Sequence, residues 1–373
     1  MIFLGAGASA PFNIPTTTRL TEDMRSLLTS HGKLLEEIDD FFEFTYDRKP
    51  NYENILTILR DLGTPERRSR FYDGFINRFP EYKGKKLNFD EIIDEMYNRI
   101  IEYCTSFVCG KQAFTPKKLE EIFRETYDLL FAVCPSDIVF TTNYDPSLEL
   151  WCQKRNIVLS DQTHVTQNPE IKTFSTANDP VFTKTTGLAA AESPIIGLVR
   201  LHGSVWVYDT TDNKMVKLQR PKDKLLFSDL YPFLTNKKPV MIFPGQEERL
   251  SRGQWDRLYQ FFKDKLERRC VVIGYSFRDE VINRVFIDNL VAGRIGRIFI
   301  IDPRPEEVKS NLLYGQQISP NQQHRIITIE AKFGDRDLID KFAFYFKANK
   351  EGFITRMENI RNYSKKSLNL VVD

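Results

Sequence analysis

Short apolar runs rich in β-branched residues recur along the chain, at residues 2–4, 138–141, 198–201, 240–243, 270–273, 298–301 and 326–329. Each run is almost continuously apolar, which is typical of a strand that is covered on both faces in a parallel sheet. Several runs are followed by a helical pattern. The clearest spans residues 253–269, where apolar side chains fall on one face and charged side chains on the other. This alternation of strands and helices predicts an α/β fold with helices on both faces of a parallel sheet.

Between residues 33 and 134 the pattern changes to helices only. The segments "DEIIDEMYNRIIEYCTSFV" at 90–108 and "LEEIFRETYDLLFAV" at 119–133 each carry one apolar stripe. We therefore predict a large helical insertion after the first strand. The predicted division has a discontinuous sheet domain at 1–30 and 135–335, the insertion at 31–134, and a helical tail at 336–373.

Two further segments have a distinctive composition. Residues 163–187 are rich in Thr, Asn and Pro with little periodicity, which predicts a long loop or lid. The tail begins with the basic and aromatic stretch "KFAFYFKANKEGF" at 341–353. Its first interpretation is a helix that docks on its own domain, and the alternative is contact with a partner or another subunit.

The composition is that of a folded, water-soluble protein with ample material for a core. Its 373 residues exceed what one core usually supports, and 41% are hydrophobic, 13% aromatic and 28% charged. A net charge of +2 does not indicate nucleic acid or an anionic membrane as a partner. Residue Met1 lies directly at the start of an apolar strand, so we suspect that a few residues precede it.

The cysteines and the hydropathy indicate a cytoplasmic location. There are five cysteines without a Cys-x-x-Cys pair, which supports neither a disulfide framework nor a zinc knuckle and predicts reduced thiols: Cys104, Cys109, Cys134, Cys152 and Cys270. No apolar run approaches the roughly 18 residues that span a bilayer.

Two glycine-containing turns follow predicted strands. The first, "IFLGAGASA", has Gly5 and Gly7 and then Ser9, so that the backbone can approach a ligand and the next helix can offer N–H groups to a phosphate. It is not a complete G-x-G-x-x-G, and a structural turn would need glycine too. The second, "VVIGYSFRDE", has Gly274 and Ser276, and its Asp279 can cap the following helix. Two such turns in one parallel sheet favour nucleotide binding.

Polar residues also end two other strands. Asp302 ends the run "IFIID" and can accept hydrogen bonds from ribose hydroxyls. A structural role as the acid of a turn or of a helix cap explains this residue equally well. His202 follows an apolar strand in "LVRLHGSVW", where ligands of open α/β sheets bind, and a structural role is equally open. The other histidines, His31, His164 and His324, are expected at the surface.

The stretch "VFTTNYDPSLEL" at 139–150 ends a buried strand in a polar cluster. Asn143 is neutral at every pH, so it would position a substrate or a water molecule and not carry protons. Asp145 can accept a ribose hydroxyl or stabilise a developing positive charge. The alternative is that Asn143 and Asp145 only form an Asx turn at the start of a helix.

Four motifs in this order, "GAGAS", "TTNYD", "LHGS" and "GYSFRDE", resemble the sirtuin-like (Sir2-type) NAD-consuming proteins of the bacterial antiphage defence class. The resemblance implies a sirtuin-like fold, in which a Rossmann-like parallel sheet has helices on both faces and a large helical insertion. It implies a reactive centre of Asn143, Asp145 and His202. It also implies NAD-binding residues, with Asp302 a looser transfer: Gly5, Ala6, Gly7, Ser9, Thr142, Gly274, Ser276 and Asp302.

The chain also departs from the protein-deacetylating sirtuins. These carry a four-cysteine zinc module between the His and the second turn, where this chain has only Cys270, so we expect no metal. Their Gly-Ile-Pro-Asp-Phe-Arg stretch reads "FNIPTTTRL" here, with Asn13 in place of Gly and Thr16 and Thr17 in place of Asp and Phe. Asn13 can tolerate a left-handed turn, and Arg19 is a candidate substitute for the arginine.

These departures match the defence branch of the family, which cleaves nicotinamide from NAD. The sequence therefore predicts an NAD⁺ glycohydrolase, a hydrolase of N-glycosyl bonds that releases ADP-ribose and nicotinamide and depletes NAD in antiviral defence. The alternatives are an NAD-dependent protein deacylase and a non-catalytic sensor of NAD or ADP-ribose. Since uncontrolled hydrolysis would kill the host, the resemblance implies control by homo-oligomerisation, by a HerA-type ATPase or by a phage protein.

Overall fold

The computed structural model describes residues 1–63, 69–85, 87–108, 113–160, 163–165, 171–174, 195–209, 215–218, 239–243, 253–266, 268–347 and 349–368. Cys109 and most of the predicted loop, residues 166–170 and 175–187, lie outside these ranges.

The main sheet has seven strands, all parallel, in the order β11-β10-β9-β1-β2-β6-β3. The strands are β1 (Ile2–Leu4), β2 (Ile138–Thr141), β3 (Val158–Ser160), β6 (Ile195–Arg200), β9 (Arg269–Ile273), β10 (Arg297–Asp302) and β11 (Ile326–Glu330). The chain leaves β1 toward β2 on one side and later returns to β9 on the other side. A switch point of this kind opens a crevice at the carboxyl ends of the strands.

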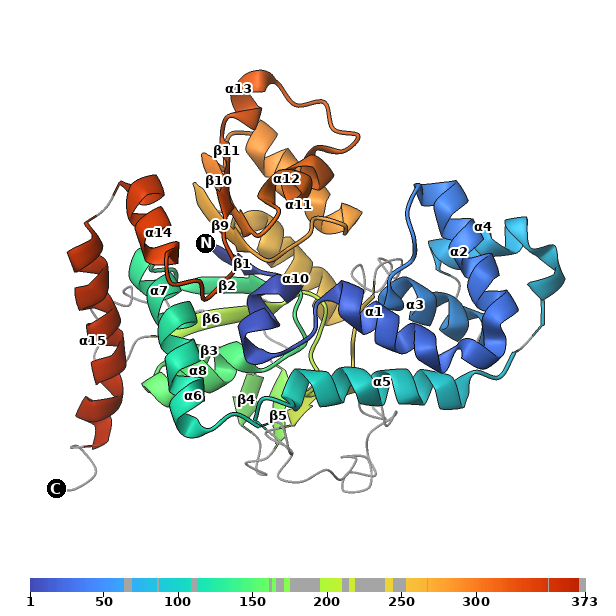
Figure 1. Ribbon diagram of the computed structural model, residues 1–373, viewed down its shortest axis with the longest axis horizontal. Helices are drawn as coiled ribbons and strands as arrows, with labels where there is room; N and C mark the ends of the chain where they lie inside the picture. The colour runs from blue at the N-terminus through green and yellow to red at the C-terminus, as the bar shows by residue number, and fades with distance from the viewer. Residues whose placement is uncertain are drawn as a thin grey trace.

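Helices cover both faces of this sheet, as predicted, because successive side chains of a strand point to opposite faces. Phe3 and Phe140 lie in one core with α10 (Gly253–Asp264), α11 (Glu280–Val291) and α12 (Pro305–Leu313). Leu4 and Val139 lie in the other core with α8 (Ser147–Arg155) and α14 (Leu338–Phe346). Figure 1 shows α8 and α14 on one side of the sheet and α11 and α12 on the other. The predicted fold class is confirmed.

A separate layer of helices has its own core. It consists of α1 (Thr17–Leu27), α2 (Gly32–Tyr46), α3 (Tyr52–Gly63), α4 (Arg70–Arg78) and α5 (Asp90–Thr105), on the right of Figure 1. Apolar side chains such as Phe42, Ile58 and Met96 are fully buried there. Tyr144 and Phe243, which belong to the sheet domain, are buried in the same core and join the two parts.

The helices just before β2 pack with the sheet and not with this layer. They are α6 (Pro116–Phe123), the π-helical turn η4 (Arg124–Asp128) and α7 (Leu129–Val133). Buried Asp128 accepts hydrogen bonds from Trp151 and Arg155 of α8, which fixes them to the sheet domain. The two cores therefore place α1 with the helical layer and α6 and α7 with the sheet. The domain boundaries at residues 31 and 134 remain a prediction.

Two predictions about strands and loops need correction, and one strand was missed. Residues 240–243 form no strand, and Met241 makes only an isolated bridge to Gly203. Strand β3 was not predicted, since residues 158–160 alone carry too short a pattern. The predicted loop contains β4 (Thr163–Val165) and β5 (Ile171–Phe174), which join β7 (Val207–Asp209) and β8 (Met215–Leu218) in an antiparallel sheet of four strands. Its pairing of β5 with β8 is long-range, which local composition does not reveal.

The tail docks on its own domain. Phe346 of α14 stacks on Phe299 of β10, and Phe353 and Ile360 of α15 (Lys350–Leu368) are buried in the sheet core. The Arg356 guanidinium donates a hydrogen bond to the Ala132 carbonyl of α7. The first interpretation of the tail is therefore confirmed, and contact with another subunit remains a prediction. Short helical segments complete the described elements: η1 (Ala6–Phe12), η2 (Thr29–His31), η3 (Pro80–Tyr82) and α13 (Pro320–Gln323).

The glycine turns after β1 and β9 are in backbone contact, which yields a prediction about Gly274. Gly274 has φ +59°, and a Cβ there would lie 2.4 Å from backbone atoms of Gly7 and Ala8. Gly293 also has positive φ, +75°, but nothing lies within 4 Å of its Cβ position. We expect Gly293→Ala to cost about 1–2 kcal/mol of unfolding free energy from backbone strain alone, and Gly274→Ala to cost clearly more.

Urea unfolding of both variants measures this difference. The matched pair separates the clash from the strain, because both positions have a left-handed backbone. Equal costs at the two positions would contradict a tight contact between the turns.

Candidate functional site

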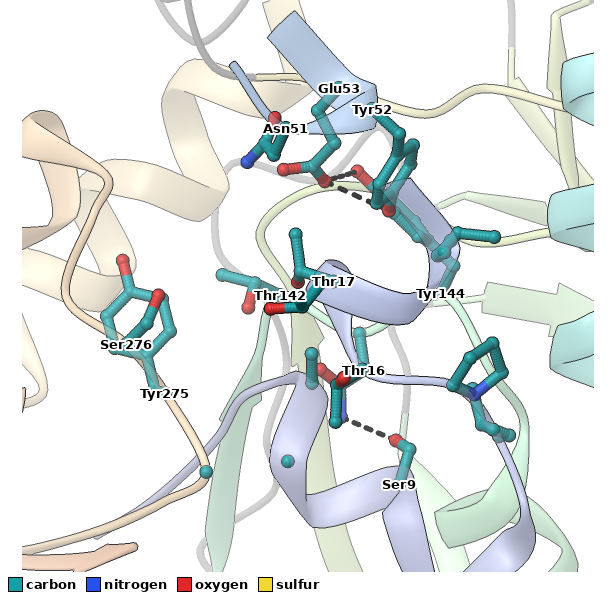
Figure 2. Close-up of a pocket in the computed structure, with 18 of the residues that line it drawn as sticks. Ser9, Thr16, Thr17, Asn51, Tyr52, Glu53, Thr142, Tyr144, Tyr275 and Ser276 are labelled. Atoms are coloured by element: carbon teal, nitrogen blue, oxygen red, sulfur yellow. Dashed lines mark hydrogen bonds between the residues drawn. The ribbon is translucent and has the colours of Figure 1, made fainter. Parts of the chain in front are cut away.

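A pocket opens at the switch point, at the carboxyl ends of the central strands. Its walls come from the turns after β1, β2, β9 and β10, from His202 after β6, and from α1 and α3 of the helical layer. Figure 2 shows Ser9, Thr142 and Ser276 on the sheet side and Tyr52 and Glu53 on the helical side. The pocket therefore lies between two separately packed parts of the chain.

The two glycine turns form the floor of this pocket. The Gly5 N–H donates to the Ile273 carbonyl at 2.9 Å, and the Gly7 N–H donates to the Gly274 carbonyl at 2.8 Å. A Cβ on Gly5 would lie 2.5 Å from the Tyr275 Cα, so only glycine permits this approach. The helix after the first turn is the short 3₁₀ helix η1, and Asn13 ends it with φ 59°. The expected left-handed turn at Asn13 is confirmed.

The Asn143 side chain is held by groups from the first turn. Its Nδ2 donates to the Gly5 carbonyl at 2.8 Å and to Ser9 Oγ at 2.9 Å. Since both amide hydrogens are used in this way, the carbonyl oxygen Oδ1 is the atom that the amide offers to a ligand. The main-chain carbonyl of Asn143 accepts a hydrogen bond from Arg200, which the sequence did not identify.

Asp145 is buried, and both of its carboxylate oxygens have partners. Oδ2 accepts from Ser9 Oγ at 2.5 Å, and Oδ1 accepts from the Ser147 N–H at 3.0 Å. The second bond is the Asx turn that the sequence offered as an alternative. Asp145 thus connects Ser9 to the start of α8 and supports Asn143 through Ser9.

His202 is only 5% exposed and faces a carboxylate. Its Nε2 lies 3.0 Å from Asp279 Oδ2. Asp279 also caps α11, as predicted, since its Oδ1 accepts from the N–H groups of Val281 and Ile282. Burial raises the pKa of Asp279, but the bond to His202 and the two N–H bonds outweigh it, so the pKa lies below the ordinary 3.8.

Glu53 is a pocket carboxylate that the sequence analysis missed. Its Oε1 accepts hydrogen bonds from the Tyr144 hydroxyl at 3.1 Å and the Tyr52 hydroxyl at 3.3 Å, drawn as dashed lines in Figure 2. Burial raises the pKa of Glu53, while His202 and the two phenols oppose that rise. In sequence, an acid in the first turn of α3 reads only as a favourable helix start. Only the fold brings it to His202.

The structure brings nearly all predicted site residues to this one pocket. Gly5 does not line the pocket, but its carbonyl accepts a hydrogen bond from Asn143, which does. The other predicted residues all line it: Ala6, Gly7, Ser9, Thr142, Asn143, Asp145, His202, Gly274, Ser276 and Asp302. Asp302 also accepts the Arg304 N–H at 2.9 Å, as a turn acid does, and burial raises its pKa.

Some expectations about other residues are corrected. Arg19 is exposed and does not line the pocket, whereas Arg48, Arg278 and Arg304 do. His324 is exposed as expected, but His31 is half-buried against the Phe89 ring. The side chain of His164 lies outside the described residues.

In the described ranges, no helix is both long and apolar enough to span a membrane.

Comparison with known proteins finds one family model that is similar to part of the chain. Residues 137–321 match the family model of the SIR2-like domain, which makes this part of the chain similar to that family. That range includes Asn143, Asp145, His202 and the second glycine turn. None of the curated proteins matches the chain.

Solved structures of Sir2 homologues are similar to the chain at low sequence identity. A Sir2 homologue in complex with NAD has 14% identity and a TM-score of 0.41, over 93% of this chain and 88% of that chain. A mutant Sir2 homologue in complex with ADP-ribose has 14% identity and a TM-score of 0.40, over 100% and 94%. Sir2Tm bound to a propionylated peptide has 12% identity and a TM-score of 0.35, over 93% of each.

The double role of Asp279 yields a prediction on stability. Asn can still cap α11 but cannot carry the charge, and Ala can do neither. We expect Asp279→Ala to lower the free energy of unfolding by about 1 kcal/mol more than Asp279→Asn does. The depressed pKa adds stability that is present above pH 3.8 and is lost as the pH falls through the lower folded-state value.

Urea unfolding at pH 7 and at pH 3 tests both statements. The gap between wild type and Asp279→Asn should narrow at the lower pH, because below pH 3.8 the unfolded chain takes up a proton at Asp279 more readily than the native protein does. A gap that is as wide at pH 3 as at pH 7 would show that the charge of Asp279 does not stabilise the fold.

Proposed function

We propose that this protein is an NAD⁺ glycohydrolase that binds NAD in the pocket at the switch point and cleaves the bond between nicotinamide and ribose. The observation that carries the proposal is that the Asn143 amide and the His202 ring line the same pocket as both glycine turns. The SIR2-like match over residues 137–321 supports NAD as the substrate. NAD and water are converted to ADP-ribose, nicotinamide and a proton.

The glycine turns and the strand ends bind the dinucleotide. The pyrophosphate lies above the two turns, whose backbones pack against each other at Gly5, Gly7 and Gly274. Ser9, Thr142 and Ser276 add hydroxyl groups around it. Asp302, at the end of β10, accepts hydrogen bonds from ribose hydroxyls.

The reaction proceeds through an oxocarbenium-like transition state, in which positive charge develops on the ribose as neutral nicotinamide leaves. The leaving group needs no proton. Asn143 uses its free carbonyl oxygen to orient the attacking water, and His202 bonds a ribose hydroxyl and acts as a base, oriented by Asp279. Asp145 stabilises the ribose ring mainly in an indirect way, because it accepts a hydrogen bond from Ser9, and Ser9 in turn holds the Asn143 amide in place.

The contents of the chain between His202 and Gly274 favour hydrolysis over protein deacylation. Its only cysteine, Cys270, is fully buried in β9 and faces the sheet core. A four-cysteine zinc module therefore has no ligand set in this segment. The groove residues Thr16 and Thr17 line the pocket in place of the acid and the aromatic residue of deacylating sirtuins.

The biological role that we propose is NAD depletion in bacterial antiviral defence, in the cytoplasm. An enzyme that consumes NAD must stay inactive until infection, so control comes from homo-oligomerisation or from a partner such as a HerA-type ATPase or a phage protein. The outer face of the tail fits a contact of this kind, because Phe344 of α14 is 76% exposed.

The direct test is to incubate the purified protein with NAD, alone and with candidate partners, and to quantify free nicotinamide. Release of nicotinamide with ADP-ribose supports the proposal. Acetylated ADP-ribose formed from an acetyl-lysine peptide would instead establish a deacylase. Tight NAD binding without turnover, even with the partner present, would establish a sensor.

The residue roles predict the effect of single substitutions. Asn143→Ala and His202→Ala should each reduce NAD cleavage by at least about 100-fold, because each removes a group that acts at the reacting sugar. Both variants should keep a cooperative thermal transition. The matched control is His324→Ala, since His324 is exposed and lies away from the pocket.

Nicotinamide release at saturating NAD measures the loss, and thermal unfolding checks the fold. Full turnover by both pocket variants would refute the roles of Asn143 and His202. A loss of similar size in His324→Ala would indicate that the assay reports stability and not chemistry.

A further inference from the structure

Glu53 stands apart from the other acids of the protein by its position. It enters the pocket from α3 of the helical layer, opposite the strand ends that carry Asn143 and His202. It is close enough to His202 for that ring to lower the pKa of the Glu53 carboxyl group. Glu53 is thus a carboxylate beside the proposed reactive centre that the proposed function has not yet used.

The two carboxylate oxygens of Glu53 have different surroundings. Oε1 accepts both phenol hydrogen bonds, from Tyr52 and Tyr144. Oε2 has no hydrogen-bond partner among the described residues, and Figure 2 shows the carboxylate of Glu53 directed away from the helix into the pocket. The phenols therefore fix the group in one orientation and leave one oxygen for a ligand.

Glu53 carries its negative charge in a pocket that Arg48, Arg278 and Arg304 also line. No Lys or Arg in the described part of the chain forms an ion pair with it, and the charged groups that influence it are His202 and Asp279. One imidazole thus faces two carboxylates, so the cluster is negative when both carboxylates are ionised, even with the imidazole protonated. Glu53 is half-buried, and a cation that forms beside a partly desolvated carboxylate is stabilised by it.

We propose that Glu53 is a catalytic residue of this site, the carboxylate that stabilises the positive charge developing on the nicotinamide ribose. This inference rests on the proposed NAD cleavage, which places that charge at the sugar between Asn143 and His202. The interaction strengthens as the bond to nicotinamide breaks, so it lowers the barrier more than it tightens substrate binding. Asp145 serves this role less directly, because both of its oxygens are already bonded within the protein.

The first test compares steady-state kinetics of Glu53 variants. Glu53→Gln keeps the shape and the two phenol contacts but removes the charge, and it should lower kcat for nicotinamide release by about 100-fold with little change in KM. Glu53→Asp keeps the charge at a greater distance and should retain part of the rate. The matched control is Glu91→Gln, an exposed acid in the first turn of α5, which should behave as wild type.

The second test measures binding and needs no turnover. Its probes are ADP-ribose, whose terminal sugar is neutral, and the ADP-ribose analogue in which a protonated pyrrolidine replaces that sugar ring. Wild type should bind the cationic analogue at least about 10-fold more tightly than ADP-ribose, and Glu53→Gln should lose this preference. A merely structural Glu53 would weaken both ligands alike. Calorimetric titration gives the two dissociation constants.

The outcomes separate this inference from the function on which it rests. If wild type releases nicotinamide and Glu53→Gln does so at the same rate, Glu53 is not catalytic and the glycohydrolase stands. If wild type binds both probes but never cleaves NAD, the glycohydrolase proposal fails, and the catalytic role of Glu53 fails with it. Loss of rate together with loss of the cationic preference, in a variant with an unchanged melting temperature, supports the assignment.

Discussion

The contact between the turns after β1 and β9 is the constraint on which the rest of the site depends. Gly7 and Gly274 approach closely enough for a backbone hydrogen bond, and neither position has room for a Cβ. The same turn presents the Gly5 carbonyl and the Ser9 hydroxyl to the Asn143 amide. Two glycine turns thus create the crevice and also set the orientation of the amide inside it.

The site also depends on the helical layer, which closes the pocket from the side opposite the strand ends. Tyr144 connects the two parts, because it follows β2 and is buried in the core of the helical layer. Its one hydroxyl proton is shared between Glu53 Oε1, at 3.1 Å, and the Ile242 carbonyl, at 3.0 Å. The main chain of this segment is held in turn by Arg200, which pairs with Glu149 of α8. The groups that we propose to be reactive are therefore supported by hydrogen bonds from both cores, as a preorganised site requires.

The sequence predicted the parts of this molecule that depend on local pattern. The central strands were visible as continuous apolar runs, and the polar residues that end them were visible as candidates because strand ends meet at one edge. The four-stranded antiparallel sheet was not visible, because the pairing of β5 with β8 joins segments far apart in sequence. The run at 240–243 was misread, because apolar residues buried in a loop look like a strand.

The same reasoning explains why Glu53 escaped notice and Asp279 did not. Asp279 lies next to a glycine turn, and its capping role follows from its neighbours in sequence. Glu53 lies in α3, and the sequence pattern of this helix indicates only which side chains form its apolar face. The groups that surround the Glu53 carboxylate, Tyr144 and His202, come from other elements of the fold. The Glu53 carboxylate is therefore positioned by residues of both the helical layer and the sheet domain. In the proposed mechanism the helical layer therefore contributes to the chemistry as well as to the core, and any movement of α3 relative to β2 would change the distance between Glu53 and the substrate.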